Sequence, residues 1–321
     1  MKRYFKSVLG MLVVFALCAF VGGLAVGEAL AAVPVPKSNT IYDCAGNQAN
    51  EFSLMATMHC VKLAKEFGWD VITLDAQSDM VRQISNVETA IGAGAAAIIL
   101  DPVSSDGLSG VLLTAVNSGI PVICILGYTT NQDQLTAHVT PGYTRAGELK
   151  MEQVAADLGG KGRIAIIRST EGHSVANMIT DGYYNVLKNF PDIEVVYFGT
   201  GDWSAPSATP LAETWLTADP NLDAIVCNND GMALGVRPVI ESMGLEDKVK
   251  LYGLDAVSEA RSYVRGGGCF KATVMIDIGT IYRRSFEIIE KFYKGENFDK
   301  YVNIDSVVIT AENINEYFPN D

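Results

Sequence analysis

The sequence predicts an α/β fold in which parallel sheets are flanked by helices, arranged as two lobes joined at a hinge. Short and almost purely apolar runs alternate with longer amphipathic runs along most of the chain. Strands that are apolar on both faces are typical of parallel sheets covered by helices. The alternation restarts after Thr140-Pro141-Gly142, which has the composition of a turn and not of a long linker. Two similar α/β units with so short a connection favour two lobes and a hinge.

In the first unit, apolar runs bounded by turn residues predict strands, and apolar residues repeated every three or four positions predict helices. The run AAAIIL at 95–100 is the clearest strand because it contains no polar residue. The expected strands are 41–44, 70–75, 95–100 and 121–126. The expected helices between them are 52–67, 80–91 and 108–116.

The second unit shows the same alternation, with RIAIIR at 163–168 and IEVVYF at 193–198 as its first two strands. The further expected strands are 223–227, 248–254, 271–276 and 307–310. The expected helices are 145–158, 174–189, 210–218, 232–243, 258–264 and 278–293.

Composition and charge narrow the class of partner. The 321 residues are 49% hydrophobic, which is enough for a packed core. The 24 Lys and Arg residues face 37 Asp and Glu residues, so the formal net charge is −13. A nucleic-acid partner requires a basic surface, so we expect none.

The N-terminus has the pattern of a secretory signal peptide. Residues 8–26 contain no charged side chain, basic side chains precede this run, and Ala29-Leu30-Ala31 follows it. We therefore expect residues 1–31 to be removed and the protein to act in the periplasm or otherwise outside the cytoplasm. An uncleaved anchor helix is the alternative, because the run is nearly long enough to span a bilayer. Cys18 does not fit a lipoprotein site because a bulky leucine precedes it.

The cysteines beyond this segment show no metal or redox motif. No pair has CxxC spacing, so no zinc knuckle and no thioredoxin motif is present, and we expect no metal site. Buried free thiols are the favoured interpretation, with one disulfide left open. The five residues are Cys44, Cys60, Cys124, Cys227 and Cys269.

Polar residues at the ends of the expected strands are the candidates for a binding site. Ligands of open parallel sheets bind beyond the carboxyl ends of the strands. Two lobes that present such loops to each other would enclose a cleft. The candidate loops are 47–52, 101–102, 127–128, 168–174, 201–203, 228–230 and Asp255.

Nucleotide and catalytic motifs are absent from the sequence. There is no GxxxxGK[ST], and the GAG at 92–94 precedes a strand whereas a dinucleotide fingerprint follows one. There is no GxSxG and no HExxH either. We therefore expect no cofactor and no enzymatic activity.

A few side chains in the strand-end loops favour contact with a ligand. Trp203 lies in a loop where an indole has little reason to serve the core, and Phe52 begins a helix that faces the expected cleft. His173 could bind a ligand or could be a solvated loop residue. In Asn229-Asp230, the aspartate fits a helix N-cap, which leaves Asn229 as the better ligand candidate.

Several sequence segments that contain these residues resemble type I periplasmic substrate-binding proteins, in the ribose-binding branch of sugar ABC-transporter receptors. The resemblance covers nearly the whole chain beyond the signal segment, and the order and spacing of the segments carry it. The most specific is Asn229-Asp230-Gly231-Met232-Ala233-Leu234-Gly235. The others include Leu74-Asp75-Ala76-Gln77, Ala97-Ile98-Ile99-Leu100-Asp101-Pro102, Gly119-Ile120-Pro121-Val122, Asp181-Gly182-Tyr183 and Gly253-Leu254-Asp255.

The resemblance implies two Rossmann-like lobes that are linked by three chain crossings and close on a sugar by hinge motion. The crossings fall near Pro141-Gly142, Ile276-Asp277 and Asn303. The N-terminal lobe is then 32–141 plus 277–303, and the C-terminal lobe is 142–276 plus 304–321. A monomer is expected, and its closed form would dock on the membrane permease of an ABC importer. Residues that keep the family's ligand-binding pattern are Asn50, Phe52, Trp203, Asn229 and Asp255.

Three positions depart from the family pattern. Leu126-Gly127 replaces an Asp-Arg pair, Asn177 replaces an arginine, and Ile276 replaces a hinge glutamine. Hydrogen bonds to charged groups contribute about 1.5–3 kcal/mol each. Without these partners, ribose would lose most of its affinity. Tyr128, His173 and Asp277 are the candidate substitutes. We expect a neutral sugar, a polyol or a related small polar solute, with room for an apolar or cationic portion.

Three other functions share some of these features. A sensory receptor that presents its ligand to a chemoreceptor or sensor kinase would have the same sequence pattern. A secreted sugar-active enzyme would use Asp230 and Asp255 as a carboxylate pair, although capping and hydroxyl binding suit them better. A transcription regulator is disfavoured by the export signal and by the lack of a helix-turn-helix.

Overall fold

The computed structural model describes residues 34–171 and 173–320. The expected signal peptide and Cys18 lie outside the described residues. Within the described part, no helix combines the length and the apolar character needed to span a membrane.

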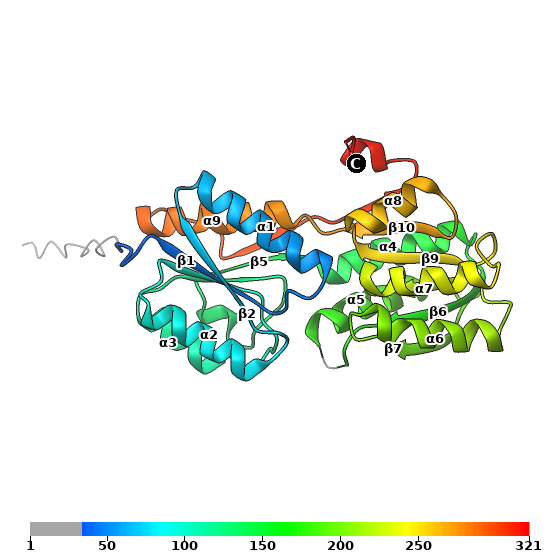
Figure 1. The fold of residues 1–321 in the computed structure, drawn as a ribbon, viewed down its shortest axis with the longest axis horizontal. Coiled ribbons are helices and arrows are strands. Elements are labelled where there is room, and N and C mark those ends of the chain that lie inside the picture. The colour runs from blue at the N-terminus through cyan, green and yellow to red at the C-terminus, as the bar shows by residue number, and fades with distance from the viewer. Residues whose placement is uncertain (1–33, 172, 321) are drawn as a thin grey trace, which may run out of the picture. The chain divides into compact units, whose positions relative to one another are not determined.

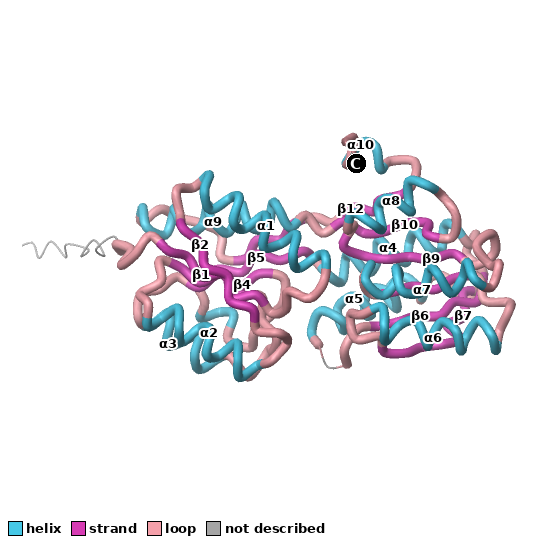
Figure 2. The backbone as a smooth tube through the Cα atoms, viewed as in Figure 1, coloured by secondary structure: helices cyan, strands magenta, loops and turns pink. Residues whose placement is uncertain are grey.

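Two six-stranded sheets organise the chain (Figures 1 and 2). The strand order of the first sheet is β11-β5-β4-β3-β1-β2, and every pairing in it is parallel. Its register aligns Thr40 with Asp70 and Ile41 with Ala97. The strands are β1 (Thr40–Ala45), β2 (Asp70–Asp75), β3 (Ala97–Leu100), β4 (Val122–Ile125), β5 (Ala137–Pro141) and β11 (Tyr301–Ile304).

The second sheet has the order β12-β10-β9-β8-β6-β7 and is mixed, because β12 runs antiparallel to β10. All its other pairings are parallel. The expectation of parallel sheets therefore needs a correction at this edge. The strands are β6 (Gly162–Arg168), β7 (Ile193–Thr200), β8 (Ala224–Cys227), β9 (Lys250–Asp255), β10 (Phe270–Met275) and β12 (Val307–Thr310).

Helices cover both faces of each sheet. In the first lobe, α1 and α9 pack together on one face, and α2 and α3 on the other (Figure 1). In the second lobe the corresponding pairs are α4 with α5 and α6 with α7. The helices are α1 (Glu51–Glu66), α2 (Met80–Gly92), α3 (Ser109–Asn117), α4 (Tyr143–Asp157), α5 (Ser174–Leu187), α6 (Ala205–Ala218), α7 (Asp230–Ser242), α8 (Ser258–Gly266), α9 (Ile278–Lys294) and α10 (Ile314–Tyr317), with a 3-10 turn η1 (Gln132–Gln134).

The strands bury side chains on both faces, as the apolar runs predict. In β6, Ile164 and Ile166 join the cluster under α4 and α5, whereas Ala165 and Ile167 join the cluster under α6 and α7. Apolar runs without polar alternation are therefore explained by helical layers on both sides. The described cysteines are all buried and free, which confirms the interpretation as buried thiols.

The chain passes between the sheets three times. The passages join β5 to α4, β10 to α9, and β11 to β12, near the three crossings that the resemblance implies. Helix α9 thereby returns to the first lobe, where it packs against α1, β5 and β11.

Two strands and one helix start differ from the sequence expectation. The segment at 140–142 is more than a turn, because β5 runs through Pro141, and β11 was also missed. Helix α6 begins at Ala205, five residues before the expected start at Pro210, and holds this proline in its interior. Proline removes one backbone donor but does not end this helix, whose inner face is buried through Ala208 and Ala212.

Candidate functional site

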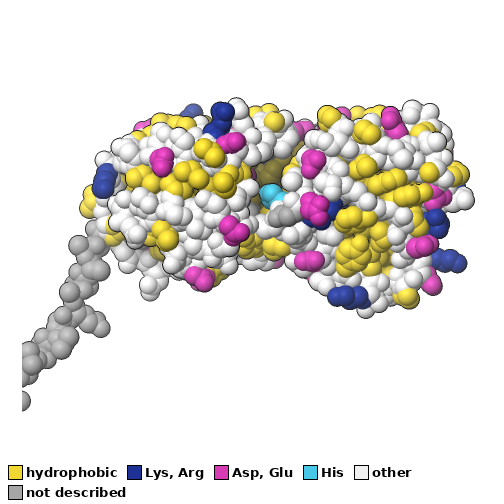
Figure 3. All heavy atoms as spheres, turned by 90° about the horizontal axis from the view of Figure 1, so that it is seen from below, with side chains coloured by type: hydrophobic (Ala, Val, Ile, Leu, Met, Phe, Trp, Pro, Cys, Tyr) yellow, Lys and Arg dark blue, Asp and Glu magenta, His cyan; other side chains and the backbone are white. Residues whose placement is uncertain are grey.

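A cavity of about 720 Å³ lies between the two lobes. Figure 3 looks onto the hollow between them, in which hydrophobic side chains are visible. The carboxyl ends of β1, β3 and β4 border the cavity on the first lobe, and those of β7, β8 and β9 border it on the second. The lining side chains with polar or aromatic groups are Asn47, Asn50, Phe52, Ser53, Ser78, Asp101, Tyr143, Thr170, His173, Asp202, Trp203, Ser204, Asn229 and Asp255.

On the first lobe, Asn50 and Phe52 reach the cavity from the start of α1. Asn50 is the N-cap of this helix, and its side-chain oxygen accepts a hydrogen bond from the Ser53 backbone N–H at 2.9 Å. The cap uses the oxygen of the amide and leaves its NH₂ group for a ligand. Phe52 adds an apolar ring beside it.

On the second lobe, Trp203 and His173 form an aromatic pair on the cavity wall. The two rings meet edge to face with centroids 5.5 Å apart. Trp203 and Asp202 both have left-handed backbone conformations, with φ of 60° and 46°, so a strained turn holds the indole in place. Burial lowers the pKa of His173, and its Nδ1 has no hydrogen-bond partner, so this imidazole is neutral at neutral pH.

The capping roles at the end of β8 are the reverse of the expectation. Asn229 is the N-cap of α7, and its side chain accepts from the Met232 backbone N–H at 3.0 Å. Asp230 is instead fully buried and accepts from the Val257 N–H at 3.0 Å and from the Thr273 hydroxyl at 2.7 Å. Asn229 still lines the cavity, and Asp230 connects α7 to β10 and to the start of α8.

Burial shapes the charge of the carboxyl pair at this end of the second sheet. Burial raises the pKa of Asp230 to about 6. Burial and the neighbouring Asp230 raise the pKa of Asp255 well above its usual value, while Lys150 opposes this shift. Lys150 is itself buried, which lowers its pKa to about 7, and it donates to the Cys227 carbonyl at 2.6 Å. Lys150 does not line the cavity; it binds the backbone at the end of β8, shortly before the lining residue Asn229.

The first lobe places one carboxyl group of its own on the cavity wall. Asp101 follows β3 and is partly exposed to the cavity. Burial and the nearby Asp43 raise its pKa to about 7, and a hydrogen bond from the Gly46 backbone opposes this shift. A side chain at Gly46 would place its Cβ 3.2 Å from the Asp101 carboxylate, so the glycine permits this close approach.

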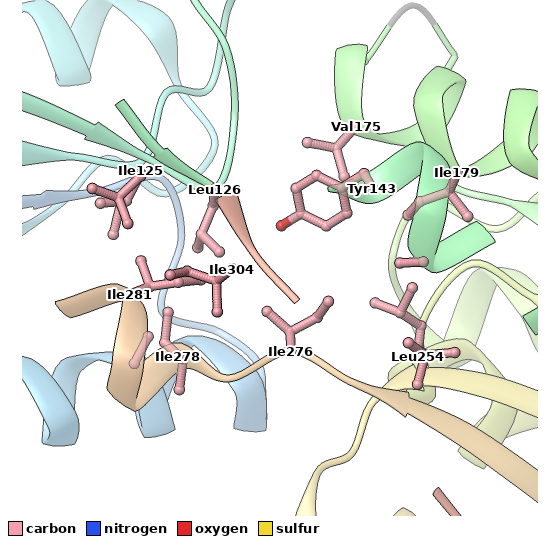
Figure 4. Packing of buried hydrophobic residues seen from close by; sticks show 14 of the residues in the cluster. Ile125, Leu126, Tyr143, Val175, Ile179, Leu254, Ile276, Ile278, Ile281 and Ile304 are labelled. Atoms are coloured by element: carbon pink, nitrogen blue, oxygen red, sulfur yellow. The ribbon is translucent and has the colours of Figure 1, made fainter. Parts of the chain in front are cut away.

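The hinge side of the cavity is apolar. Figure 4 shows apolar side chains from both lobes, including Leu126, Tyr143, Leu254 and Ile276, gathered around the crossing between β10 and α9. Leu126 and Leu254 line the cavity. The positions at which the resemblance implies an aspartate and a glutamine, Leu126 and Ile276, thus belong to one hydrophobic cluster.

Six of the ten predicted site residues line the cavity: Asn50, Phe52, His173, Trp203, Asn229 and Asp255. The structure does not bring the other four to its wall, because each is engaged elsewhere. Tyr128 packs on the His138 ring at 4.4 Å, and Asn177 accepts from Arg168 at 2.7 Å. Ile276 is buried in the hinge cluster, and Asp277 caps α9 by accepting from the Thr280 N–H at 2.9 Å.

Eight of the fourteen polar or aromatic lining residues were not singled out from the sequence, and Asp101 and Tyr143 are two of them. Asp101 belonged to a candidate loop but was not chosen as a ligand contact, and Tyr143 was not considered. Tyr143 opens α4 directly after the first crossing, and this position at the hinge was the available signal. Within the described residues, no group of three or more His, Cys, Asp or Glu side chains could hold a metal ion.

Comparison with known proteins identifies the family. A family model described as "Periplasmic binding protein domain" matches residues 44–297. The chain belongs to the periplasmic binding protein family. A ribose import binding protein of Bacillus subtilis is 26% identical over 254 residues, which are 79% of this chain and 81% of that protein.

Two solved structures share the arrangement of both lobes. An ABC transporter solute binding protein from Bacillus halodurans C-125, with bound myo-inositol, has a TM-score of 0.81 and 30% identity and covers 87% of this chain and 96% of its own. A Caulobacter myo-inositol binding protein, also bound to myo-inositol, has a TM-score of 0.81 and 26% identity and covers 89% and 98%. This periplasmic binding protein therefore shares its fold with relatives whose structures contain a bound polyol.

Proposed function

We propose that this periplasmic binding protein captures a sugar or polyol between its lobes and delivers it to the membrane permease of an ABC importer. The observation that carries the proposal is the cavity, which both lobes line with aromatic rings and with amide and hydroxyl groups. Sugars and polyols present apolar faces that pack on aromatic rings and hydroxyl groups that exchange hydrogen bonds.

The relatives support the ligand class and the transport role. The two similar structures hold myo-inositol, and the Bacillus subtilis relative is a ribose import binding protein. The hinge side of this cavity is apolar at Leu126, where the resemblance implies a charged pair. This difference favours a ligand other than ribose.

We further propose where the protein acts, in which oligomeric state, and without which partners. Signal-peptide removal after Ala31 would release the chain outside the cytoplasm. The protein would act as a monomer, without a cofactor and without a nucleic-acid partner. The lobes, 32–141 with 277–303 and 142–276 with 304–321, would close about the three crossings.

The proposal also holds that the protein is not an enzyme. The carboxyl groups of Asp230 and Asp255 would have to act as a catalytic pair. Asp230, however, is fully buried and is bonded to the Thr273 hydroxyl and the Val257 N–H. Its hydrogen bonds favour a structural role.

A thermal-shift screen of sugars and polyols tests the proposal. A ligand that binds only the folded state raises its stability by RT ln(1 + [L]/Kd), so a ligand at 100 times its Kd adds about 2.7 kcal/mol. We expect at least one sugar or polyol to raise the melting temperature, and its concentration to remain constant on prolonged incubation. A screen without any shift would contradict the ligand class, and consumption of the ligand would contradict the binding role.

A further inference from the structure

The charges on the cavity wall are one-sided. Among the lining residues that the structure describes, Asp101, Asp202 and Asp255 carry carboxyl groups, and none is a lysine or an arginine. His173 is neutral for the reason given above. The wall therefore offers carboxyl groups to a ligand and no basic side chain that is charged at neutral pH.

The three carboxyl groups differ in what balances them. Asp202 is exposed, so water screens it. The positive charge of Lys150, a buried residue outside the cavity wall, lowers the pKa of Asp255. In the part of the chain that the structure describes, no basic group shifts the pKa of Asp101: the group that raises it besides burial is another carboxyl, Asp43.

The further titratable groups around Asp101 do not supply a cation either. Burial raises the pKa of the Cys124 thiol and of the Tyr143 and Tyr282 phenols. The negative charge of Asp101 raises the pKa of the same three groups further. These groups are neutral at neutral pH. Asp101 is thus a partly buried acid on the wall of a ligand cavity, held by a backbone N–H of Gly46 and left without a counter-ion.

We propose that the solute carries a protonated amino group and that Asp101 is its counter-ion, so that the ligand is an amino-substituted polyol or sugar. This inference rests on the proposed function and names its substrate class more narrowly. An ammonium group would give Asp101 a charge-assisted hydrogen bond at the moment when the ligand excludes water from it. A neutral polyol would supply no positive charge, so the same carboxylate would have to bind a proton when the ligand excludes water from it.

Two further observations agree with an organic cation of this kind. The apolar hinge side, with Leu126 on the wall, suits the carbon skeleton of a ligand whose charged end lies elsewhere. A bare metal ion fits less well, because the described residues contain no cluster of three metal-binding side chains.

The experiment compares matched pairs of ligands that differ only in one group. The first pair is myo-inositol and an inosamine, in which one hydroxyl is replaced by an amino group. The second is D-glucose and D-glucosamine, with N-acetyl-D-glucosamine as the uncharged amide control. Affinities are measured by calorimetry at pH 7.5 on the protein without its signal segment.

We expect the amine of at least one pair to bind about 10- to 100-fold more tightly than its hydroxyl partner, as a charged hydrogen bond predicts. Below pH 7 the amine is mainly protonated while Asp101 binds a proton, so the amine's preference should shrink about tenfold per pH unit in this range. The affinity of the neutral member should change less.

Variants assign the effect to one carboxyl group. Asp101→Asn should abolish the preference, and Asp101→Glu should retain part of it. Asp247→Asn removes the same charge from an exposed loop residue and should leave the preference unchanged within about twofold. The wild-type comparison stands by itself if Asp101→Asn does not fold.

The outcomes separate this inference from the proposed function. If the hydroxyl member binds as tightly as the amine in every pair that binds, or if the preference survives in Asp101→Asn, the inference is overturned and the proposed function stands. If no sugar, polyol or amine binds at all, the proposed function fails and the inference fails with it.

Discussion

A hydrogen-bonded link between the lobes allows closure of the lobes to be tested by a single substitution. Glu51 opens α1 in the first lobe, and its carboxylate accepts from both the hydroxyl and the backbone N–H of Ser258, the latter at 2.9 Å. Ser258 opens α8 in the second lobe, where the N-cap residue Val257 has no side chain that can cap the helix. Glu51 therefore caps a helix that belongs to the opposite lobe.

The free energy that this link contributes can be worked out from the groups that it joins. A carboxylate at a helix N-terminus contributes about 0.3–1 kcal/mol, and a hydrogen bond to a charged group about 1.5–3 kcal/mol. Both residues are exposed, so the low end of these ranges applies and the sum is about 1.8 kcal/mol. The two residues belong to opposite lobes, so the link stabilises the arrangement in which the lobes approach each other.

We expect Glu51→Gln to weaken ligand binding about tenfold, because apparent affinity is proportional to the population of the binding-competent state. Glu51 does not line the cavity, so the loss would come through closure and not through ligand contact. Calorimetry with the tightest ligand of the screen measures the affinity, and small-angle scattering measures the compaction. A double-mutant cycle with Ser258→Ala isolates the pair.

The control is Glu246→Gln, which removes the same charge from an exposed loop residue. Wild-type affinity and wild-type compaction in Glu51→Gln would refute the reasoning. So would equal losses in the control, because they would indicate an effect of net charge.

Three further predictions concern single positions. Trp203→Ala should weaken sugar or polyol binding about tenfold by calorimetry, and Trp203→Phe should remove the ligand-induced change in tryptophan fluorescence; a full signal in the phenylalanine variant would exclude Trp203 as its source. Gly253→Ala should cost about 3 kcal/mol in urea unfolding, because its Cβ would lie 1.9 Å from the carboxylate of Asp230, whereas Gly110→Ala, with open space around it, should cost nothing. Burial raises the pKa of Asp43 from 3.8 to about 6, so the folded wild type loses stability as pH rises through this range. The stability of Asp43→Asn relative to wild type should therefore increase by about 3 kcal/mol between pH 4 and pH 8, and parallel curves would contradict the assignment.

The strands can be predicted from the sequence where they are apolar and are missed where polar residues alternate with apolar ones. The strand β3 is a pure apolar run and was predicted within two residues. The strand β5 was missed because it alternates His138 and Thr140 with apolar residues. Both polar side chains are buried and satisfied by carbonyls of the preceding loop, His138 by Gly127 at 2.7 Å and Thr140 by Leu126 at 3.0 Å. Such partners lie far along the chain and leave no local pattern.

The candidate site could be predicted at the level of loops but not of individual roles. Strand ends pointed to the cavity because parallel strands bring their carboxyl ends to one edge. The choice between Asn229 and Asp230 as the helix cap was wrong, since it depends on Thr273 and Val257, which the fold brings to Asp230 from β10 and from the start of α8. The imbalance of charge around Asp101 likewise exists only once the lobes and their buried neighbours are in place.

The three passages between the sheets have a consequence for biosynthesis. A chain made from its N-terminus produces β5 long before α9 and β11, which complete the first lobe. Until residue 304 has been made, one edge of β5 is unpaired, and Phe67 lacks Phe286, on which it stacks at 5.6 Å. The second lobe likewise waits for β12, near the end of the chain. Neither lobe can finish folding before its last strand has been made, and a chain that ends before α9 would expose the apolar face of α1 to aggregation.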